Sequence, residues 1–157
     1  MPVKKLKEYL DANTVKYVCI QHSPAITAQE VAASAHISGK EIAKTVIVKV
    51  NGELAMAVMP ANEFVDLELL RDVSGADKVE LATESEFEDR FPGCELGGMP
   101  PFGNLYGMQV FVAEHLSEDE QIAFNGGNHS ELIQLSYEDF QHLVQPKMIP
   151  AYEGTTS

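Results

Sequence analysis

The dipeptide Asn51-Gly52 constrains the fold more than any other feature, because it joins two apolar segments through residues that suit a tight turn. Residues 44–50 are rich in β-branched side chains, and residues 54–59 are apolar at consecutive positions. Asparagine and glycine both tolerate positive φ, so this spacing predicts a β-hairpin with a two-residue loop. The unbroken apolar pattern of the second segment indicates a central strand that is covered on both faces.

Lys44 is the unusual residue of this hairpin. Side chains alternate between the two faces of a strand, so Lys44 shares a face with the valines at 46, 48 and 50, whereas Lys49 takes the other face. Placing a lysine charge on an apolar face costs free energy unless the ammonium is paired or takes part in a functional site. One interpretation is a strand-end lysine whose ammonium reaches water along its stem, and the other is a site residue.

The rest of the chain predicts short helices and strands in irregular alternation. Expected helices cover residues 2–12, 27–35, 65–73, 83–91 and 136–144; expected strands cover residues 17–20, 78–81, 108–113, 121–125 and 131–135. Regular βαβ spacing is missing from this order. We therefore expect a mixed α/β fold, with a barrel-like mixed β-sheet and surrounding helices.

Length and charge limit the possible functions. The chain has 157 residues and is expected to form a single domain over residues 1–150, followed by a frayed tail over residues 151–157. It has neither an apolar run of membrane-spanning length nor a secretory signal pattern, so we expect a cytoplasmic protein. The net charge of −13 argues against a broad DNA or RNA surface, but it leaves room for a small pocket that takes one nucleotide end.

Cysteine and histidine residues give weaker signals. Cys19 and Cys94 are too few for a disulfide framework or a metal set, and no base that would activate Cys94 as a nucleophile is visible in the sequence. His22 precedes a Ser-Pro turn and His36 follows an expected helix, positions where a loop or capping role competes with a catalytic one.

The segment 92–103, with the sequence PGCELGGMPPFG, cannot form regular secondary structure. Its glycines and prolines leave several backbone N–H groups without sheet partners. Such a loop can present donors to an oxyanion or a phosphate, or it can act as a rigid connector. It is not the phosphate loop of a nucleotide hydrolase, because no Lys-Ser or Lys-Thr pair follows the glycines.

Three stretches together resemble one family, the YbaK and prolyl-tRNA synthetase-associated editing domains. They are His22-SPAITAQEVA with the downstream Lys44-TVIV, then Gly97-GMPPFG103, then Phe124-NGGNHSELIQLSYEDF140. The resemblance covers nearly the whole chain in the same order. It implies a barrel-like α/β fold and a trans-acting hydrolase that removes a wrong small amino acid, such as alanine or cysteine, from the acceptor end of tRNA.

The resemblance also implies site residues. The catalytic positions are Lys44, Gly97, Gly98 and His129. The substrate-binding positions are His22, Thr27, Met99, Pro101, Phe102, Gly103, Asn125 and Gly127. It implies no metal or organic cofactor. From the lack of a membrane-spanning run and from the net charge we expect no membrane and no DNA partner, and an aminoacyl-tRNA synthetase is an expected partner. His129 either positions water or the terminal ribose, or is a turn histidine without a role.

One position departs from the family pattern. Many relatives carry serine or threonine where this chain has Pro100, so any hydroxyl contact made there in relatives is absent. This departure and the acidic charge leave two alternatives open. One is a non-catalytic binding or regulatory module that uses the same pocket, and the other is a hydrolase of other small aminoacyl esters.

Overall fold

The computed structural model describes residues 2–21, 30, 41–61, 63–91, 99–127 and 131–150. Its strands are β1 (Tyr17–Gln21), β2 (Ala43–Val50), β3 (Glu53–Pro60), β4 (Val79–Leu81), β5 (Gln109–Ala113), β6 (Gln121–Asn125), β7 (Glu131–Ser136) and β8 (Lys147–Ile149). Its α-helices are α1 (Pro2–Ala12), α3 (Leu67–Ser74), α4 (Glu84–Phe87), α5 (Glu114–Ser117) and α6 (Tyr137–Val144), and short 3-10 helices are η2 (Glu88–Arg90) and η3 (Gly103–Leu105). The expected helix over residues 27–35, apart from residue 30, and the tail over residues 151–157 lie outside the described residues.

The predicted hairpin is confirmed. Strands β2 and β3 pair antiparallel from Ala43 opposite Pro60 to Val50 opposite Glu53. The loop residues Asn51 and Gly52 have φ of 50° and 83°, the conformation that the Asn-Gly pair favours. Strand β3 is central and almost entirely buried, as its unbroken apolar pattern predicts.

The strands form two sheets. The smaller has the order β1-β7-β6 and the larger has the order β4-β2-β3-β5-β8. In the larger sheet β5 runs parallel to β3 and β8 runs parallel to β5, so the predicted mixed sheet is confirmed. Among the described residues an isolated bridge between Ile42 and Ala123 links the sheets. Within the described residues the sheets do not close into a cylinder, so the barrel-like shape that we expected is not confirmed.

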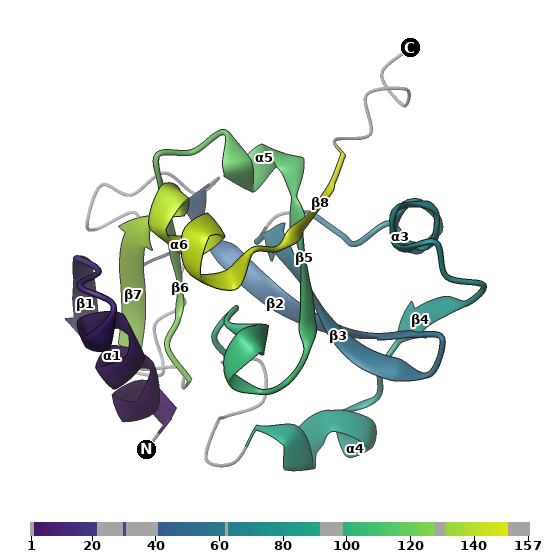
Figure 1. The fold of residues 1–157 in the computed structure, drawn as a ribbon, viewed down its shortest axis with the longest axis horizontal. Coiled ribbons are helices and arrows are strands. Elements are labelled where there is room, and N and C mark those ends of the chain that lie inside the picture. Colours follow the sequence, from purple (N-terminus) through teal and green to yellow (C-terminus); the bar gives the residue numbers. More distant parts are fainter. Residues whose placement is uncertain are drawn as a thin grey trace.

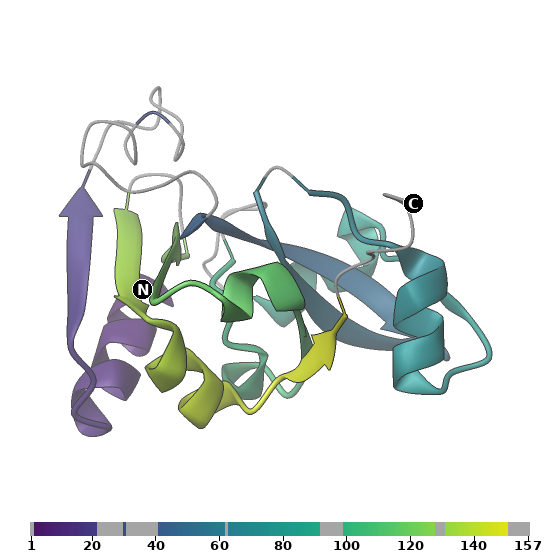
Figure 2. The same ribbon diagram turned by 90° about the horizontal axis from the view of Figure 1, so that it is seen from above.

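Two apolar clusters pack on the opposite faces of the β2-β3 hairpin. The larger cluster takes Ile47, Met56 and Val58 from the hairpin, with side chains from α1, α6, β5 and the smaller sheet. The second cluster takes Val48, Ala55, Ala57 and Met59, and helix α3 contributes Leu70 to it. Figures 1 and 2 place α1 with the smaller sheet at one end of the molecule and α3 at the other. The hairpin therefore spans the region between the two ends.

Helix ends follow the capping chemistry in the sequence. Asp66 accepts a hydrogen bond from Leu69 N–H at 3.0 Å at the start of α3, and Gly75 ends the helix with φ of 73°. Thr83 N–H donates to Glu86 Oε1 at 2.8 Å in the predicted capping box of α4. Ser136 Oγ accepts from Asp139 N–H at 3.1 Å at the start of α6. The expected helices over residues 65–73 and 136–144 are thus confirmed near their bounds, whereas α4 ends at Phe87, before the expected residue 91, and continues as the 3-10 helix η2.

Candidate functional site

Lys44 is the second residue of β2, directly opposite Met59 of β3. The regular register of the hairpin places it on the face of Val46 and Val48, which carries the α3 cluster. The residue is half-buried, and its Nζ lies 5.1 Å from the centroid of the Phe64 ring, within the range of a cation–π contact. In the described part of the chain Lys44 has no ion-pair partner. Its positive charge is therefore available for a ligand.

The described end of the glycine- and proline-rich loop, Met99 to Gly103, is buried. Phe102 is fully buried, and its ring lies 5.6 Å from the ring centroids of both Phe124 and Phe140. A Cβ added to Gly103 would lie 2.6 Å from Val110 Cγ2 and 2.8 Å from the Met108 carbonyl oxygen. Both residues thus fasten the end of the loop to the core, and their contacts are packing contacts.

The loop end and Lys44 belong to different packing environments. Met99 and Phe102 are part of the larger cluster, whereas Lys44 extends from the hairpin face that carries the α3 cluster. The packing clusters therefore assign the described end of the loop and Lys44 to opposite faces of the hairpin, and the approach of the loop to Lys44 stays a prediction. Residues 97 and 98, through which the loop was expected to border Lys44, lie outside the described residues.

The glycine-rich turn after β6 is described as far as Gly127. Asn125 is the last residue of β6 and pairs with Leu132 of β7. Gly126 N–H donates to the Glu131 carbonyl oxygen at 3.0 Å, and Gly127 has φ of 123°, a conformation that glycine adopts readily. The remaining predicted site residues, namely His22, Thr27, Gly97, Gly98 and His129, lie outside the described residues.

Sequence reasoning missed a polar pair near Lys44. His115 Nδ1 lies 2.7 Å from Glu63 Oε2, and both side chains are partly exposed. They border a cavity of about 70 Å³ whose lining also includes Met59, Phe64 and Ala113. His115 follows the end of β5 and Glu63 follows the end of β3. The parallel pairing of β3 and β5 brings Glu63 and His115 together, and no short motif in the sequence predicts that pairing.

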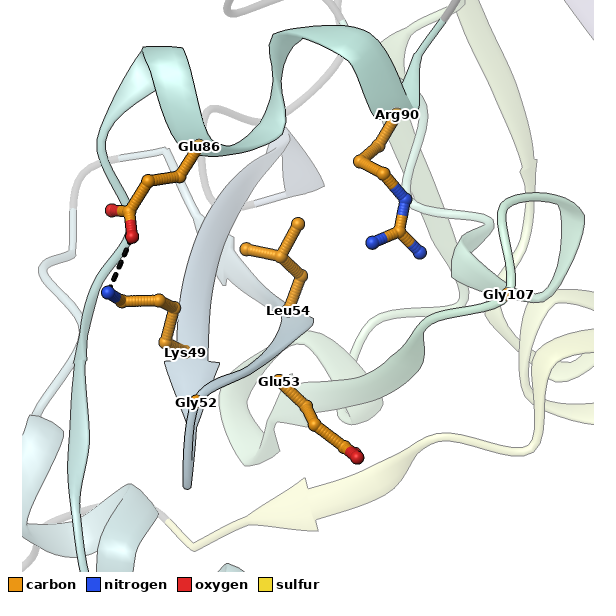
Figure 3. A pocket seen from close by; sticks show the side chains of 7 residues that line it. All are labelled: Lys49, Gly52, Glu53, Leu54, Glu86, Arg90 and Gly107. Carbon is orange, nitrogen blue, oxygen red and sulfur yellow. Dashed lines mark hydrogen bonds and ion pairs between the residues drawn. The ribbon is translucent and has the colours of Figure 1, made fainter.

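A larger cavity of about 650 Å³ lies at the other end of the hairpin, next to the Asn51-Gly52 turn. Figure 3 shows Arg90 reaching from η2 toward Leu54, while Lys49 turns to Glu86. Lys49 Nζ lies 2.5 Å from Glu86 and 3.3 Å from Glu80, and the bond from Lys49, together with hydrogen bonds from Thr83, lowers the pKa of Glu86 to about 2. Lys49 is therefore neutralised where Lys44 is not, and we do not place the site here.

The Cys19 thiol lies in a polar, partly buried environment. Cys19 Sγ donates to Glu131 Oε2 at 3.3 Å, and Lys7 Nζ contacts the same oxygen at 3.1 Å. Burial, with the bond to Glu131, raises the pKa of the Cys19 thiol, so the reactive thiolate is disfavoured.

Among the described residues no three histidine, cysteine or carboxylate side chains are grouped as metal ligands. No helix in the described ranges is both long and apolar enough to cross a membrane.

Comparisons with known proteins agree with the resemblance seen in the sequence. The model of the aminoacyl-tRNA editing domain family matches residues 22–143. A curated proline–tRNA ligase from Bacillus mycoides (strain KBAB4) is 28% identical over 87 residues, which are 55% of this chain and 15% of that protein. The chain thus spans only a small part of this relative's length.

Two solved structures share the fold. One, described as a proposed trans-editing enzyme for prolyl-tRNA synthetase, has a TM-score of 0.79 at 18% identity and covers 94% of both chains. The other, described as a hypothetical protein, has a TM-score of 0.80 at 24% identity and covers 92% of this chain and 96% of its own. At these identities the likeness concerns the fold.

Proposed function

Because the chain belongs to the aminoacyl-tRNA editing domain family, we propose that it is a trans-acting aminoacyl-tRNA deacylase. It would remove a wrongly attached small amino acid, such as alanine or cysteine, from the acceptor end of tRNA. The observation that carries this proposal is Lys44, a half-buried ammonium without an ion-pair partner in the described residues, at the end of an apolar strand.

The reaction is hydrolysis of an ester. Water attacks the carbonyl carbon, negative charge develops on the carbonyl oxygen, and collapse releases the ribose hydroxyl and the free amino acid. Such a reaction needs a positioned water and donors where the oxyanion forms. In our proposal Lys44 is an electrostatic clamp on the carbonyl oxygen or on the adjacent phosphate. At the edge of an apolar face its charge acts more strongly than in bulk water.

The remaining site residues have proposed roles around this clamp. The backbone N–H groups of Gly97 and Gly98 would donate to the aminoacyl end, and His129 would position water or the terminal ribose. The proposed substrate-binding residues are His22, Thr27, Met99, Pro101, Phe102, Gly103, Asn125 and Gly127. Within this set, the burial of Phe102 and Gly103 supports an indirect role, in which they hold the loop in place.

The size of the acyl group is the expected basis of selection. A pocket distinguishes amino acids that differ by one methylene only by roughly 1–3 kcal/mol, so an editing enzyme has to exclude larger side chains sterically. Pro100 offers no hydroxyl and is buried. Any selection among amino acids at this position would therefore depend on the shape of the pocket and not on a hydroxyl contact.

A synthetase is the proposed partner. The relative from Bacillus mycoides is a proline–tRNA ligase, and the solved structure at 18% identity is described as acting for prolyl-tRNA synthetase. The net charge of −13 repels the phosphate backbone of tRNA, so contact restricted to the acceptor end fits this chain better than a broad tRNA surface. A basic partner would supply the rest of the tRNA contacts.

The direct experiment incubates the purified protein with a panel of mischarged tRNAs and follows the loss of each amino acid. The proposal predicts faster release of one or two small amino acids and no effect on large ones. The same acidic charge also suits a non-catalytic module that uses the pocket. Retention of every amino acid, with binding of the acylated end, would favour that module over the deacylase.

A further inference from the structure

Phe64 is the most exposed large apolar side chain among the described residues, at 90% exposure. It lies between the end of β3 and the Asp66 cap of α3. Its neighbours Val65 and Leu67 pack against the α3 cluster, whereas Phe64 does not. Burial of a phenylalanine side chain stabilises a fold, and this fold forgoes that stabilisation at residue 64.

The described contact of the Phe64 ring is with Lys44, whose Nζ lies 5.1 Å from the ring centroid. The exposed aromatic surface is thus next to the residue to which we assign the electrostatic role. An ammonium beside the ring leaves aromatic surface open for a second planar group, because the side chain remains 90% exposed.

The charges around Phe64 restrict what can bind there. Glu63, Asp66 and Glu114 border the same small cavity as the ring. These three carboxylates disfavour a phosphate in the cavity itself, whereas a neutral planar base is tolerated there and a phosphate can lie on the side of Lys44. Stacking of bases on aromatic side chains is a common way to hold single-stranded nucleotide ends, because every base has a π-face.

We propose that Phe64 is a stacking platform for the terminal adenine of the acceptor end and holds the ester beside Lys44. This inference rests on the proposed function. The ester and the base are attached to the same ribose, so stacking of the base on Phe64 leaves the ester one sugar away, on the side of Lys44. Phe64 is a positioning residue and takes no part in the chemistry.

A pair of small substrates tests this role. An alanyl ester of adenosine carries the base, and alanine methyl ester lacks it. Phe64→Ala is expected to raise KM for the adenosine ester about 5- to 100-fold with little change in kcat, and to leave the methyl ester unaffected. Phe64→Tyr is expected to restore the KM. Equal losses on the two esters would mean a structural role and would overturn the proposal.

A second readout does not depend on hydrolysis. The chain contains no tryptophan, so Phe64→Trp introduces a unique fluorophore at this position. Adenosine monophosphate or the trinucleotide CCA is expected to quench its fluorescence. Leu81→Trp is the matched control, because Leu81 is 53% exposed and pairs with Val48, toward the other end of β2. Its fluorescence should not respond.

The two readouts separate the possible failures. If the protein hydrolyses neither ester but the Phe64→Trp signal is quenched, the proposed deacylase function fails and the base platform stands. If millimolar nucleotide leaves the Phe64→Trp signal unchanged, or quenches the Leu81→Trp signal equally, the platform is wrong whatever the hydrolytic activity.

Discussion

Lys44 and Lys49 lie on one strand, on opposite faces of the same sheet, and of their two ammonium groups only that of Lys49 contacts carboxylates among the described residues. Lys49 contacts the carboxylates of Glu80 and Glu86. Lys44 contacts an aromatic ring and, in the described residues, no carboxylate. One lysine is therefore part of a stabilising surface network, and the other retains a charge that can act on a substrate.

The first prediction concerns tRNA. Because of the net charge of −13, we expect weak binding of tRNA by the isolated protein and a shallow dependence on salt, since few phosphates are contacted. Addition of a synthetase or another basic partner should strengthen binding. Titrations at two salt concentrations, with and without the partner, measure both effects. Tight binding by the protein alone with a steep salt slope would contradict the acceptor-end account.

The second prediction concerns acid stability. The bond from Lys49, with hydrogen bonds from Thr83, holds the pKa of Glu86 at about 2, below its ordinary value of 4.5. A depressed folded-state pKa stabilises the protein above the unfolded-state value, and this contribution is lost as pH falls from about 4.5 through 2. We therefore expect Glu86→Gln to weaken the pH dependence of the free energy of unfolding in this range.

Urea unfolding at pH 5 and pH 3 measures that dependence. Glu84→Gln is the matched control, because Glu84 lies on the same helix and forms no ion pair among the described residues. It should keep the pH dependence of the unmodified chain. If Glu86→Gln and Glu84→Gln behave alike, the contacts of Glu86 with Lys49 and Thr83 do not persist in solution.

The third prediction concerns the end of the loop. Gly103→Ala would bring a methyl group within 2.6 Å of Val110 Cγ2, so overpacking should lower the free energy of unfolding by about 1–3 kcal/mol. Gly107→Asn is the control: its φ of 70° suits asparagine, and nothing lies within 4 Å of the added atom. Equal stability of the two variants in urea would show that the loop end adjusts easily and is not anchored as described.

The fourth prediction concerns the thiol. Because the pKa of Cys19 is raised by burial and by Glu131, its thiolate fraction near neutral pH is below that of an ordinary cysteine. In a Cys94→Ala background, alkylation of Cys19 by iodoacetamide should be slower than that of a free thiol at pH 7.5. Denaturation should remove the difference. Alkylation of the folded protein at the rate of a free thiol would place Cys19 in a different environment.

Short-range chemistry predicted much of this fold. The Asn51-Gly52 turn and the caps at Asp66 and Ser136 depend on residues only a few positions apart, so the sequence displays them directly. Helix α5 has no side-chain cap bond, and β8 has three residues and one strand neighbour, so neither carries a local signal. Whether the sheets close depends on long-range packing, and there our barrel expectation was not confirmed.

The candidate site was only partly predictable for the same reason. Alternation along β2 indicated the face of Lys44, and the register confirms it. The sequence did not indicate which face the Met99–Phe102 segment covers, because that depends on the rings of Phe124 and Phe140, which come later in the chain. The neighbours Phe64, Glu63 and His115 were missed, since strand pairing alone brings them to this end of the sheet.

The most direct test compares Lys44→Ala with Lys49→Ala on the tRNA that the protein deacylates fastest. If the Lys44 charge stabilises the developing oxyanion or the phosphate, Lys44→Ala should slow hydrolysis by about 10²- to 10³-fold, with little change in the free energy of unfolding. Lys49→Ala should show the reverse, a lower free energy of unfolding with a nearly unchanged rate, because it breaks the contacts with Glu80 and Glu86. Equal rate losses in the two variants, or full activity of Lys44→Ala, would contradict the assignment of the site to Lys44.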